Sequence, residues 1–143
     1  AKSGYGFLVG VSSSDYLGVD IEPIDRKPHN CLGVARRYFS AQEAAALEAM
    51  DASHLDHAFL RTWSCKEAVV KALGLGIANQ LCRFTVETEP DRPPAVLAFD
   101  DDDPQAWWLQ MIEPDPSFVG AVATRSEPAG LFAFRMGPSP AGA

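Results

Sequence analysis

The chain has 143 residues, of which 47% are hydrophobic and 22% charged, a composition typical of one globular domain with a single core. Its formal net charge of −7 argues against nucleic acid as the main partner, and no apolar run approaches the ~20 residues of a membrane span, so we expect no membrane association. The cysteines, Cys31, Cys65 and Cys82, form no CxxC pair, which indicates neither a zinc site nor a disulfide framework and favours a reducing, cytoplasmic setting.

The N-terminal part of the chain predicts two strands. Apolar and β-branched residues favour strands over Phe7–Val11 and Leu17–Ile21. The Ser-Ser-Ser-Asp stretch at 12–15 favours a turn between them, and two prolines then interrupt regular structure.

Helices are predicted next. Asn30 is suited to cap a short helix that runs to about Tyr38. The pattern Ser40-Ala-Gln-Glu43 is a capping box that opens an alanine-rich helix. A longer helix with an apolar stripe is predicted over about Leu55–Leu73, and Gly74 is placed to end it.

The remainder of the chain reads as strands. Short β-like runs separated by Pro, Gly and Asp are expected at Cys82–Glu87, Ala95–Phe99, Ala106–Ile112, Phe118–Ala123 and Leu131–Phe134. We therefore predict an α+β fold in which a mostly antiparallel sheet packs against a long helix. Residues 1–136 are expected to form one domain and residues 137–143 a flexible Pro/Gly/Ala tail.

The first candidate site motif is the run Gly18-Val-Asp-Ile-Glu22. Asp20 and Glu22 stand two residues apart in a predicted strand, so their side chains share one face. Carboxylates held this closely repel each other unless a cation lies between them. A solvent-exposed acidic strand face is the commoner explanation of such a pair taken alone.

The second motif is the segment Trp63–Ala72, which places Glu67 and Lys71 four residues apart on one helix face. Alone, this spacing is explained by a helix-stabilising ion pair worth about 0.2–0.5 kcal/mol, with Trp63 as a core anchor. Both motifs in one chain, with Gly74-Leu-Gly76 directly after the second, supply three carboxylates and a lysine. Those groups suit a magnesium ion and a pyrophosphate.

A basic cluster lies between the two motifs and comprises Arg26, Lys27, Arg36 and Arg37. A solvated helix face explains such a cluster as well as a docking surface for an acidic partner does.

The combined pattern resembles the 4′-phosphopantetheinyl transferase superfamily. The chain carries Gly18-Val-Asp-Ile-Glu22, then Arg37-Tyr-Phe-Ser40 with Glu43, then Trp63-Ser-Cys-Lys-Glu-Ala-Val-Val-Lys-Ala-Leu-Gly-Leu-Gly76, in the order and spacing of that family. The resemblance covers residues 3 to about 76. It is to the C-terminal half of the surfactin-synthetase-type enzymes, whereas the length is like that of holo-acyl-carrier-protein synthase.

The resemblance implies the fold of that family and Mg²⁺-dependent transfer of the 4′-phosphopantetheine group of coenzyme A to a serine of an acyl or peptidyl carrier protein. Adenosine 3′,5′-bisphosphate is the other product. The residues it implies are Asp20, Glu22 and Glu67 for the metal, Glu67 and Lys71 for catalysis, Lys2, Ser3, Lys66 and Lys71 for coenzyme A, and Arg26, Lys27, Arg36 and Arg37 for carrier-protein docking.

Length and ends add a further expectation. Because the match is to one half of a two-half enzyme, we expect a homo-oligomer, with a trimer favoured, or a missing partner half to complete the cofactor pocket. The start at Ala1 and the Pro/Gly/Ala-rich end suit a domain of a larger polyketide or fatty-acid synthase. Two alternatives stay open: a metal-dependent phosphohydrolase, and a catalytically incomplete module that only binds carrier protein.

Overall fold

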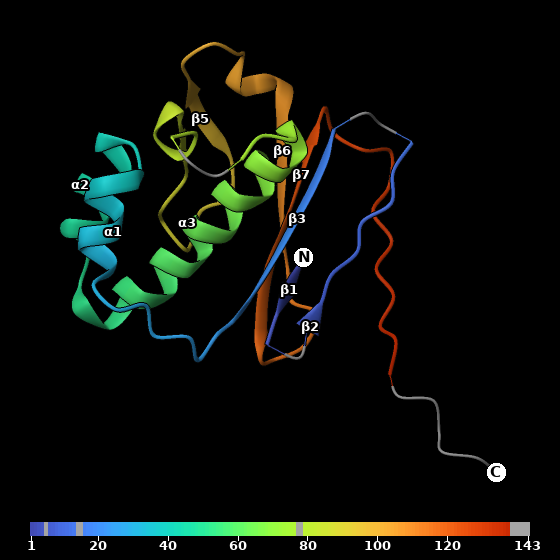
Figure 1. The fold of residues 1–143 in the computed structure, drawn as a ribbon, viewed down its shortest axis with the longest axis horizontal. Helices are drawn as coiled ribbons and strands as arrows, with labels where there is room; N and C mark the ends of the chain where they lie inside the picture. Colours follow the sequence, from blue (N-terminus) through green and yellow to red (C-terminus); the bar gives the residue numbers. More distant parts are fainter. Residues whose placement is uncertain (5, 14–15, 77–78, 138–143) are drawn as a thin grey trace.

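The computed structural model describes residues 1–4, 6–13, 16–76 and 79–137 and has an α+β architecture (Figure 1). Its elements are β1 (Lys2–Ser3), β2 (Gly6–Phe7), β3 (Leu17–Pro23), α1 (Cys31–Tyr38), α2 (Ala41–Glu48), α3 (Ala52–Leu73), η1 (Leu81–Arg83), β4 (Phe84–Val86), β5 (Val96–Phe99), η2 (Pro104–Ala106), β6 (Trp107–Ile112) and β7 (Phe118–Arg125). The predicted fold class is confirmed. None of the helices in these ranges is long and apolar enough to cross a bilayer.

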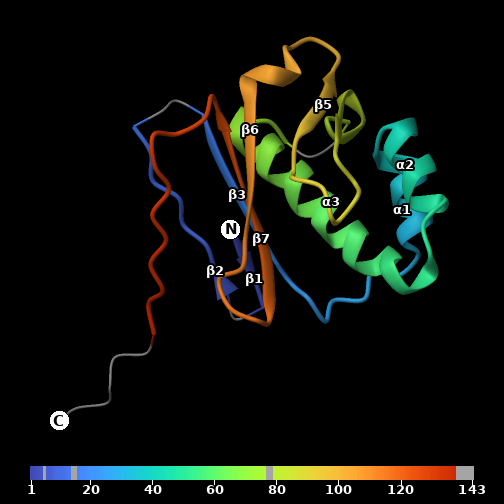
Figure 2. The same ribbon diagram turned by 180° about the vertical axis from the view of Figure 1, so that it is seen from behind.

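The central sheet has three antiparallel strands in the order β3-β7-β6, and α3 runs diagonally across one of its faces (Figures 1 and 2). Two small antiparallel pairs, β1 with β2 and β4 with β5, lie beside it. The short helices α1 and α2 pack at the far side of α3 from the sheet (Figure 2). The main core therefore lies between α3 and the sheet.

The ends of the helices follow the capping residues in the sequence. Asn30 caps α1 by accepting a hydrogen bond from the amide of Gly33 at 3.1 Å. Ser40 and Glu43 form the predicted capping box of α2. Gly74 ends α3 with a φ of 68°, a left-handed conformation that glycine adopts without strain. These three predictions are confirmed, although α3 begins three residues before the predicted start.

Close contact between α3 and β3 depends on small residues. A Cβ atom on Gly18 would lie 1.7 Å from the carbonyl oxygen of Ala68, so only glycine allows the helix backbone to approach β3 this closely. Across the strand pair, Gly18 faces Ala123 and Asp20 faces Ala121, and both alanines are fully buried. This approach brings the second candidate motif onto the first.

Two predicted strands differ from the structure. Of the predicted strand Phe7–Val11, only Phe7 lies in a strand, β2. Leu131–Phe134 forms no strand, so that prediction is wrong. Phe132 and Phe134 are 82% and 89% exposed, because no neighbouring strand in the described ranges pairs with this segment. The predicted turn at 12–15 lies partly, and the tail beyond residue 137 wholly, outside the described residues.

Candidate active site

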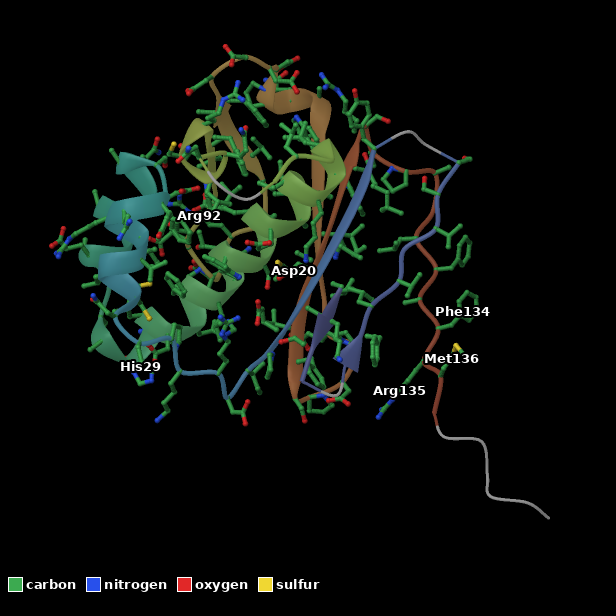
Figure 3. The ribbon with its side chains drawn as sticks, in the orientation of Figure 1. Asp20, His29, Arg92, Phe134, Arg135 and Met136 are labelled. Carbon is green, nitrogen blue, oxygen red and sulfur yellow. The ribbon has the colours of Figure 1, made fainter. Side chains whose placement is uncertain are left out.

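The two acidic motifs meet where α3 crosses β3. Asp20 and Glu22 point from β3 toward the helix because they share the face of Gly18, and Figure 3 shows Asp20 between the two elements. Glu67 comes from the facing side of α3. All three carboxylates are buried. The structure thus brings together three acids from two elements that are far apart in the sequence.

Asp20 is only partly neutralised. The Lys71 ammonium donates to its Oδ1 at 2.8 Å, whereas its Oδ2 is buried and accepts no hydrogen bond from the described residues. Burial raises the pKa of Asp20, and the Lys71 contacts oppose that rise without cancelling it. The site therefore holds more negative charge than Lys71 compensates.

Glu22 has the larger set of donors. It accepts from the Arg26 guanidinium at 2.6 Å, from the Trp63 indole N–H at 3.1 Å and from the Ser3 hydroxyl at 3.4 Å. Trp63 also stacks on Phe59, so it anchors the core as predicted and orients a site carboxylate as well. The sequence contained a signal for this second role, since the indole N–H lies one helical turn before Glu67.

Glu67 is the least satisfied of the three acids. Its Oε1 is buried and has no hydrogen-bond partner among the described residues. Burial raises the pKa of this carboxyl, and the nearby charge of Asp20 raises it further. A raised pKa suits a group that must hold or accept a proton near neutral pH.

The donor chemistry of this cluster fits a hard divalent cation. Buried, unpartnered carboxylate oxygens of Asp20 and Glu67 face one interface, and oxygen is the ligand that Mg²⁺ prefers. Within the described ranges, no three His, Cys, Asp or Glu side chains are close enough together to hold a metal ion unaided. A Mg²⁺ ion here would therefore also need water and substrate phosphate as ligands, as Mg²⁺ usually does in proteins.

Of the residues predicted to bind coenzyme A, some lie near Asp20, Glu22 and Glu67 and others lie elsewhere. Lys71 lies at the acids with its side chain 40% exposed, so it can reach an incoming anion. Ser3 contacts Glu22, whereas Lys2 points the other way and lies over the Phe7 ring at 5.4 Å.

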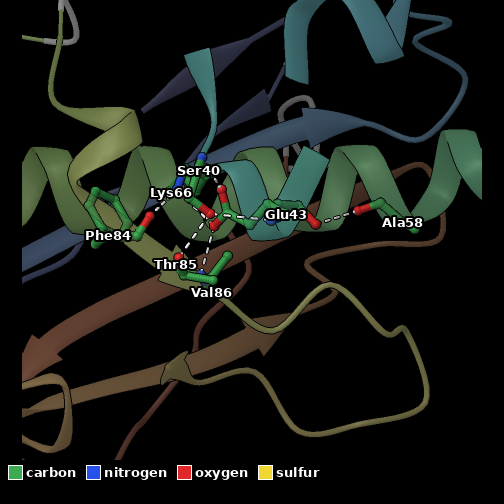
Figure 4. A network of polar contacts seen from close by, with 8 residues as sticks. Ser40, Glu43, Ala58, Lys66, Phe84, Thr85 and Val86 are labelled. Carbon is green, nitrogen blue, oxygen red and sulfur yellow. Dashed lines mark hydrogen bonds and ion pairs between the residues drawn. The ribbon is translucent and has the colours of Figure 1, made fainter. Parts of the chain in front are cut away.

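Lys66 projects from a different side of α3 than Glu67 does and lies in a closed polar network (Figure 4). Its side chain is fully buried, and its ammonium donates to Glu43 at 2.8 Å and to the Phe84 carbonyl at 2.7 Å. Consecutive helix residues project about 100° apart, which is why Lys66 and Glu67 cannot face the same site. The structure thus gives Lys66 no contact with the acids.

The basic cluster is also divided. Arg26 belongs to the acidic site through Glu22. Lys27, Arg36 and Arg37 are exposed, and the last two occupy the final turn of α1. Arg36 pairs with Glu48 on α2. Arg37 lies over the ring of Tyr38 at 5.3 Å.

Comparison with known proteins identifies the relatives of this chain. The profile of one family, described as the 4′-phosphopantetheinyl transferase superfamily, matches residues 16–123. The chain is 34% identical to the 4′-phosphopantetheinyl transferase psf-1 of Bacillus pumilus over 119 residues, which cover 83% of this chain and 49% of that protein. It is 32% identical to the 4′-phosphopantetheinyl transferase Sfp of Bacillus subtilis over 116 residues, covering 81% and 50%. The chain spans about half the length of these relatives.

Solved structures share the fold. A holo-(acyl-carrier-protein) synthase from Bacillus anthracis, solved in complex with CoA (3′,5′-ADP), aligns with a TM-score of 0.57 at 20% identity and covers 76% of this chain and 92% of its own. The Thermotoga maritima holo-[acyl-carrier-protein] synthase aligns with a TM-score of 0.54 at 19% identity, covering 76% and 61%.

Proposed function

Because the chain belongs to the 4′-phosphopantetheinyl transferase superfamily, we propose that it transfers the 4′-phosphopantetheine group of coenzyme A to a serine of an acyl or peptidyl carrier protein, in a Mg²⁺-dependent reaction. One observation carries this proposal: Asp20, Glu22 and Glu67 converge at the contact of β3 with α3, next to the half-exposed Lys71. The buried, unpartnered oxygens at that contact favour a ligand that brings positive charge.

The transfer is a phosphoryl displacement. The serine Oγ forms a bond to the β-phosphorus of coenzyme A, and the bond from that phosphorus to the bridging oxygen breaks. Adenosine 3′,5′-bisphosphate leaves with the electron pair, and the hydroxyl proton passes to a carboxylate. Negative charge grows on the phosphate oxygens during this step, so catalysis depends on positioning and on positive charge.

The residues divide these tasks between them. Asp20, Glu22 and Glu67 would hold Mg²⁺, which when bound neutralises charge on the pyrophosphate. Lys71 would contact a phosphate oxygen, since its ammonium is both partly exposed and within 2.8 Å of Asp20. Glu67 is the candidate for accepting the serine proton, directly or through water, because burial raises its pKa toward neutrality.

We further propose that a second copy of the chain, with a trimer favoured, or a missing partner half completes the coenzyme A pocket. The chain spans about half of its relatives. Neither of the two cavities described, of about 170 and 440 Å³, is lined by Asp20, Glu22 or Glu67. An exposed apolar strip on segments that run side by side in Figures 1 and 2 would bury apolar area in such an assembly. The strip comprises Phe7, Val9, Val11, Phe132, Phe134 and Met136.

The carrier protein would dock on the exposed basic residues at the end of α1. Arg36 and Arg37 present positive charge beside the half-exposed Tyr38, which would suit an acidic carrier protein. Lys27 and Arg26 extend this charge toward the acids.

The three free cysteines agree with a reducing, cytoplasmic setting. Carrier proteins from polyketide and from fatty-acid synthesis, compared as acceptors in a transfer assay, distinguish these two pathways.

Mass spectrometry of an apo carrier protein incubated with the chain, coenzyme A and Mg²⁺ tests the proposal. A gain of one phosphopantetheine on serine is the expected result. Release of phosphate or bisphosphate without a carrier protein would instead identify a phosphohydrolase. Carrier binding with no coenzyme A binding, by a monomeric chain, would identify a module that only binds.

A further inference from the structure

The outer edge of β4 is completed by side chains rather than by a strand. On its inner side β4 pairs with β5, where the Glu87 amide donates to Ala95 and the Arg83 carbonyl accepts from Asp100, each at 2.9 Å. In an antiparallel pair, alternate residues direct their backbone groups to opposite sides. The groups of Phe84 and Val86 therefore point away from β5, toward α2 and α3.

Glu43 and Lys66 take the place of the next strand along this edge. The Lys66 ammonium donates to the Phe84 carbonyl at 2.7 Å, and the Val86 amide donates to Glu43 Oε1 at 2.7 Å (Figure 4). A carbonyl at one residue and an amide two residues later are the groups that a paired strand would satisfy. A buried strand edge left unpaired would be costly.

The network is closed as well as paired. Both side chains of the ion pair are 0% exposed. Glu43 Oε2 accepts from the Ser40 amide at 2.9 Å, so one carboxylate closes the start of α2, pairs with α3 and holds β4. The Lys66 ammonium also lies 4.1 Å from the centre of the Phe84 ring. Burial lowers the pKa of Lys66, and the Glu43 charge opposes that shift.

We propose that Glu43 and Lys66 are positioning residues: their ion pair fixes α3 against the edge of β4 and thereby directs Glu67 toward Asp20. The part of this proposal that concerns catalysis rests on the proposed function. Lys66 and Glu67 are consecutive on one rigid helix, so the ammonium that is held at Phe84 also sets the rotation of the helix at Glu67. A displacement of ~1 Å in a catalytic group costs about 10²-fold in rate.

Direct contact of Glu43 with substrate is the competing interpretation. It requires the carboxylate to leave Ser40, Lys66 and Val86, which occupy both of its oxygens in a site closed to solvent. Three hydrogen bonds would have to break before Glu43 could reach a substrate. The two interpretations predict different kcat values for a variant that lacks both charges: a positioning role predicts partial recovery over the single variants, and direct contact with substrate predicts none.

The test uses Glu43→Gln, Lys66→Met and the double variant in the full chain, with Glu113→Gln as control. Glu113 is exposed and follows β6, outside the network and the docking residues. Amide hydrogen exchange at residues 84–86 reports the edge of β4. The kcat and the KM for coenzyme A report the position of Glu67.

Each single variant should speed exchange of the Val86 amide by about tenfold or more and lower kcat by a similar factor, with KM changed by less than about threefold. The double variant should be faster than the slower single variant, because a neutral pair of similar volume leaves no uncompensated charge. Its recovery should stay incomplete, because methionine cannot donate to the Phe84 carbonyl. The control should match the wild type in every measurement. If Lys66→Met fails to fold, Glu43→Gln and the double variant make the same comparison.

Unchanged exchange at Val86 in the single variants would refute the edge role. A double variant no faster than the slower single variant would contradict the positioning role, because removing both charges together would then restore no activity. If the wild-type chain transfers no phosphopantetheine, the proposed function fails, and the exchange measurements still decide the structural half of the proposal.

Discussion

Two sides of α3 carry buried acidic and basic residues that differ in how fully their carboxylate oxygens are hydrogen-bonded. On one side, Lys66 and Glu43 form a fully buried ion pair in which the carboxylate has donors on both oxygens. On the other side, Glu67 and Asp20 are equally buried, yet each keeps a carboxylate oxygen without a donor in the described structure. Lys66 and Glu67 are adjacent in the chain, so the difference comes from the elements that pack against each of them: α2 and β4 against Lys66, and β3 against Glu67.

This difference separates structural from functional charge. A buried ion pair with every group satisfied stabilises one arrangement of the chain. Buried carboxylates with unpaired oxygens destabilise the free protein, which supports the proposed ligand that supplies positive charge. Breaking the first side should therefore lower stability, with activity lost through the displacement of Glu67. Breaking the second side should lower activity while the fold is kept.

The largest expected effect is on stability, from Lys66→Met. Removing the ammonium leaves Glu43 charged and buried, which costs about 3–5 kcal/mol of unfolding free energy. Urea unfolding measures the loss, and Lys27→Met is the control because that lysine is exposed. An equal loss in the two variants would show that the buried ion pair contributes no more to stability than an exposed lysine does.

Next is the loss of activity from Asp20→Asn or Glu67→Gln. Each should lower the transfer rate on the order of 10²–10³-fold, about 3–4 kcal/mol, without unfolding the chain. Single-turnover transfer to a carrier protein measures the rate, circular dichroism checks the fold, and the exposed Glu113→Gln is the control. Near-normal turnover in both variants would contradict the role of the acids.

Gly18→Ala should disturb both sides at once. The new Cβ would overlap the Ala68 carbonyl at 1.7 Å and push α3 away from β3, at a cost of about 1–3 kcal/mol in stability. Activity should fall with it, because Glu67 moves away from Asp20. Gly76→Ala is the control, since a Cβ there meets open space. Equal stability of the two variants would show that the close approach is not required.

Lys71→Ala should act mainly on binding. Losing one charge-assisted contact to a phosphate should weaken coenzyme A binding by about 1.5–3 kcal/mol, which is roughly tenfold or more. Isothermal titration calorimetry with coenzyme A and Mg²⁺ measures the affinity. An unchanged affinity would argue that Lys71 serves only to neutralise Asp20.

The smallest effect is a gain in stability from Glu67→Gln. Because burial raises the pKa of Glu67 above its ordinary value of 4.5, the folded state binds the proton more tightly than the unfolded chain does. Its contribution to stability is complete below that ordinary value and is lost as pH rises through the raised pKa. Glutamine should therefore stabilise the fold at pH 7.5 on the order of 0.5–1 kcal/mol. The gain should vanish near pH 4; a gain of the same size at both pH values would assign it to packing.

Local structure was predictable wherever a short-range rule governs it. The Asn30 cap, the box at Ser40 and the glycine stop at Gly74 each depend on neighbours within a few residues, and all three are confirmed. The segment Leu131–Phe134 has the composition of a strand but forms none. A strand needs a partner with free backbone groups, and sequence composition does not say where that partner is.

The site divides in the same way. The acids could be identified from the sequence, because the periods of strand and helix place Asp20 with Glu22, and Glu67 with Lys71, on shared faces. The packing of distant elements shows that Lys66 is interior, that Arg26 and Trp63 contact Glu22, and that Glu43 completes an edge of β4. Periodicity fixes the direction of a side chain relative to its own element, but what lies in that direction depends on how distant elements pack.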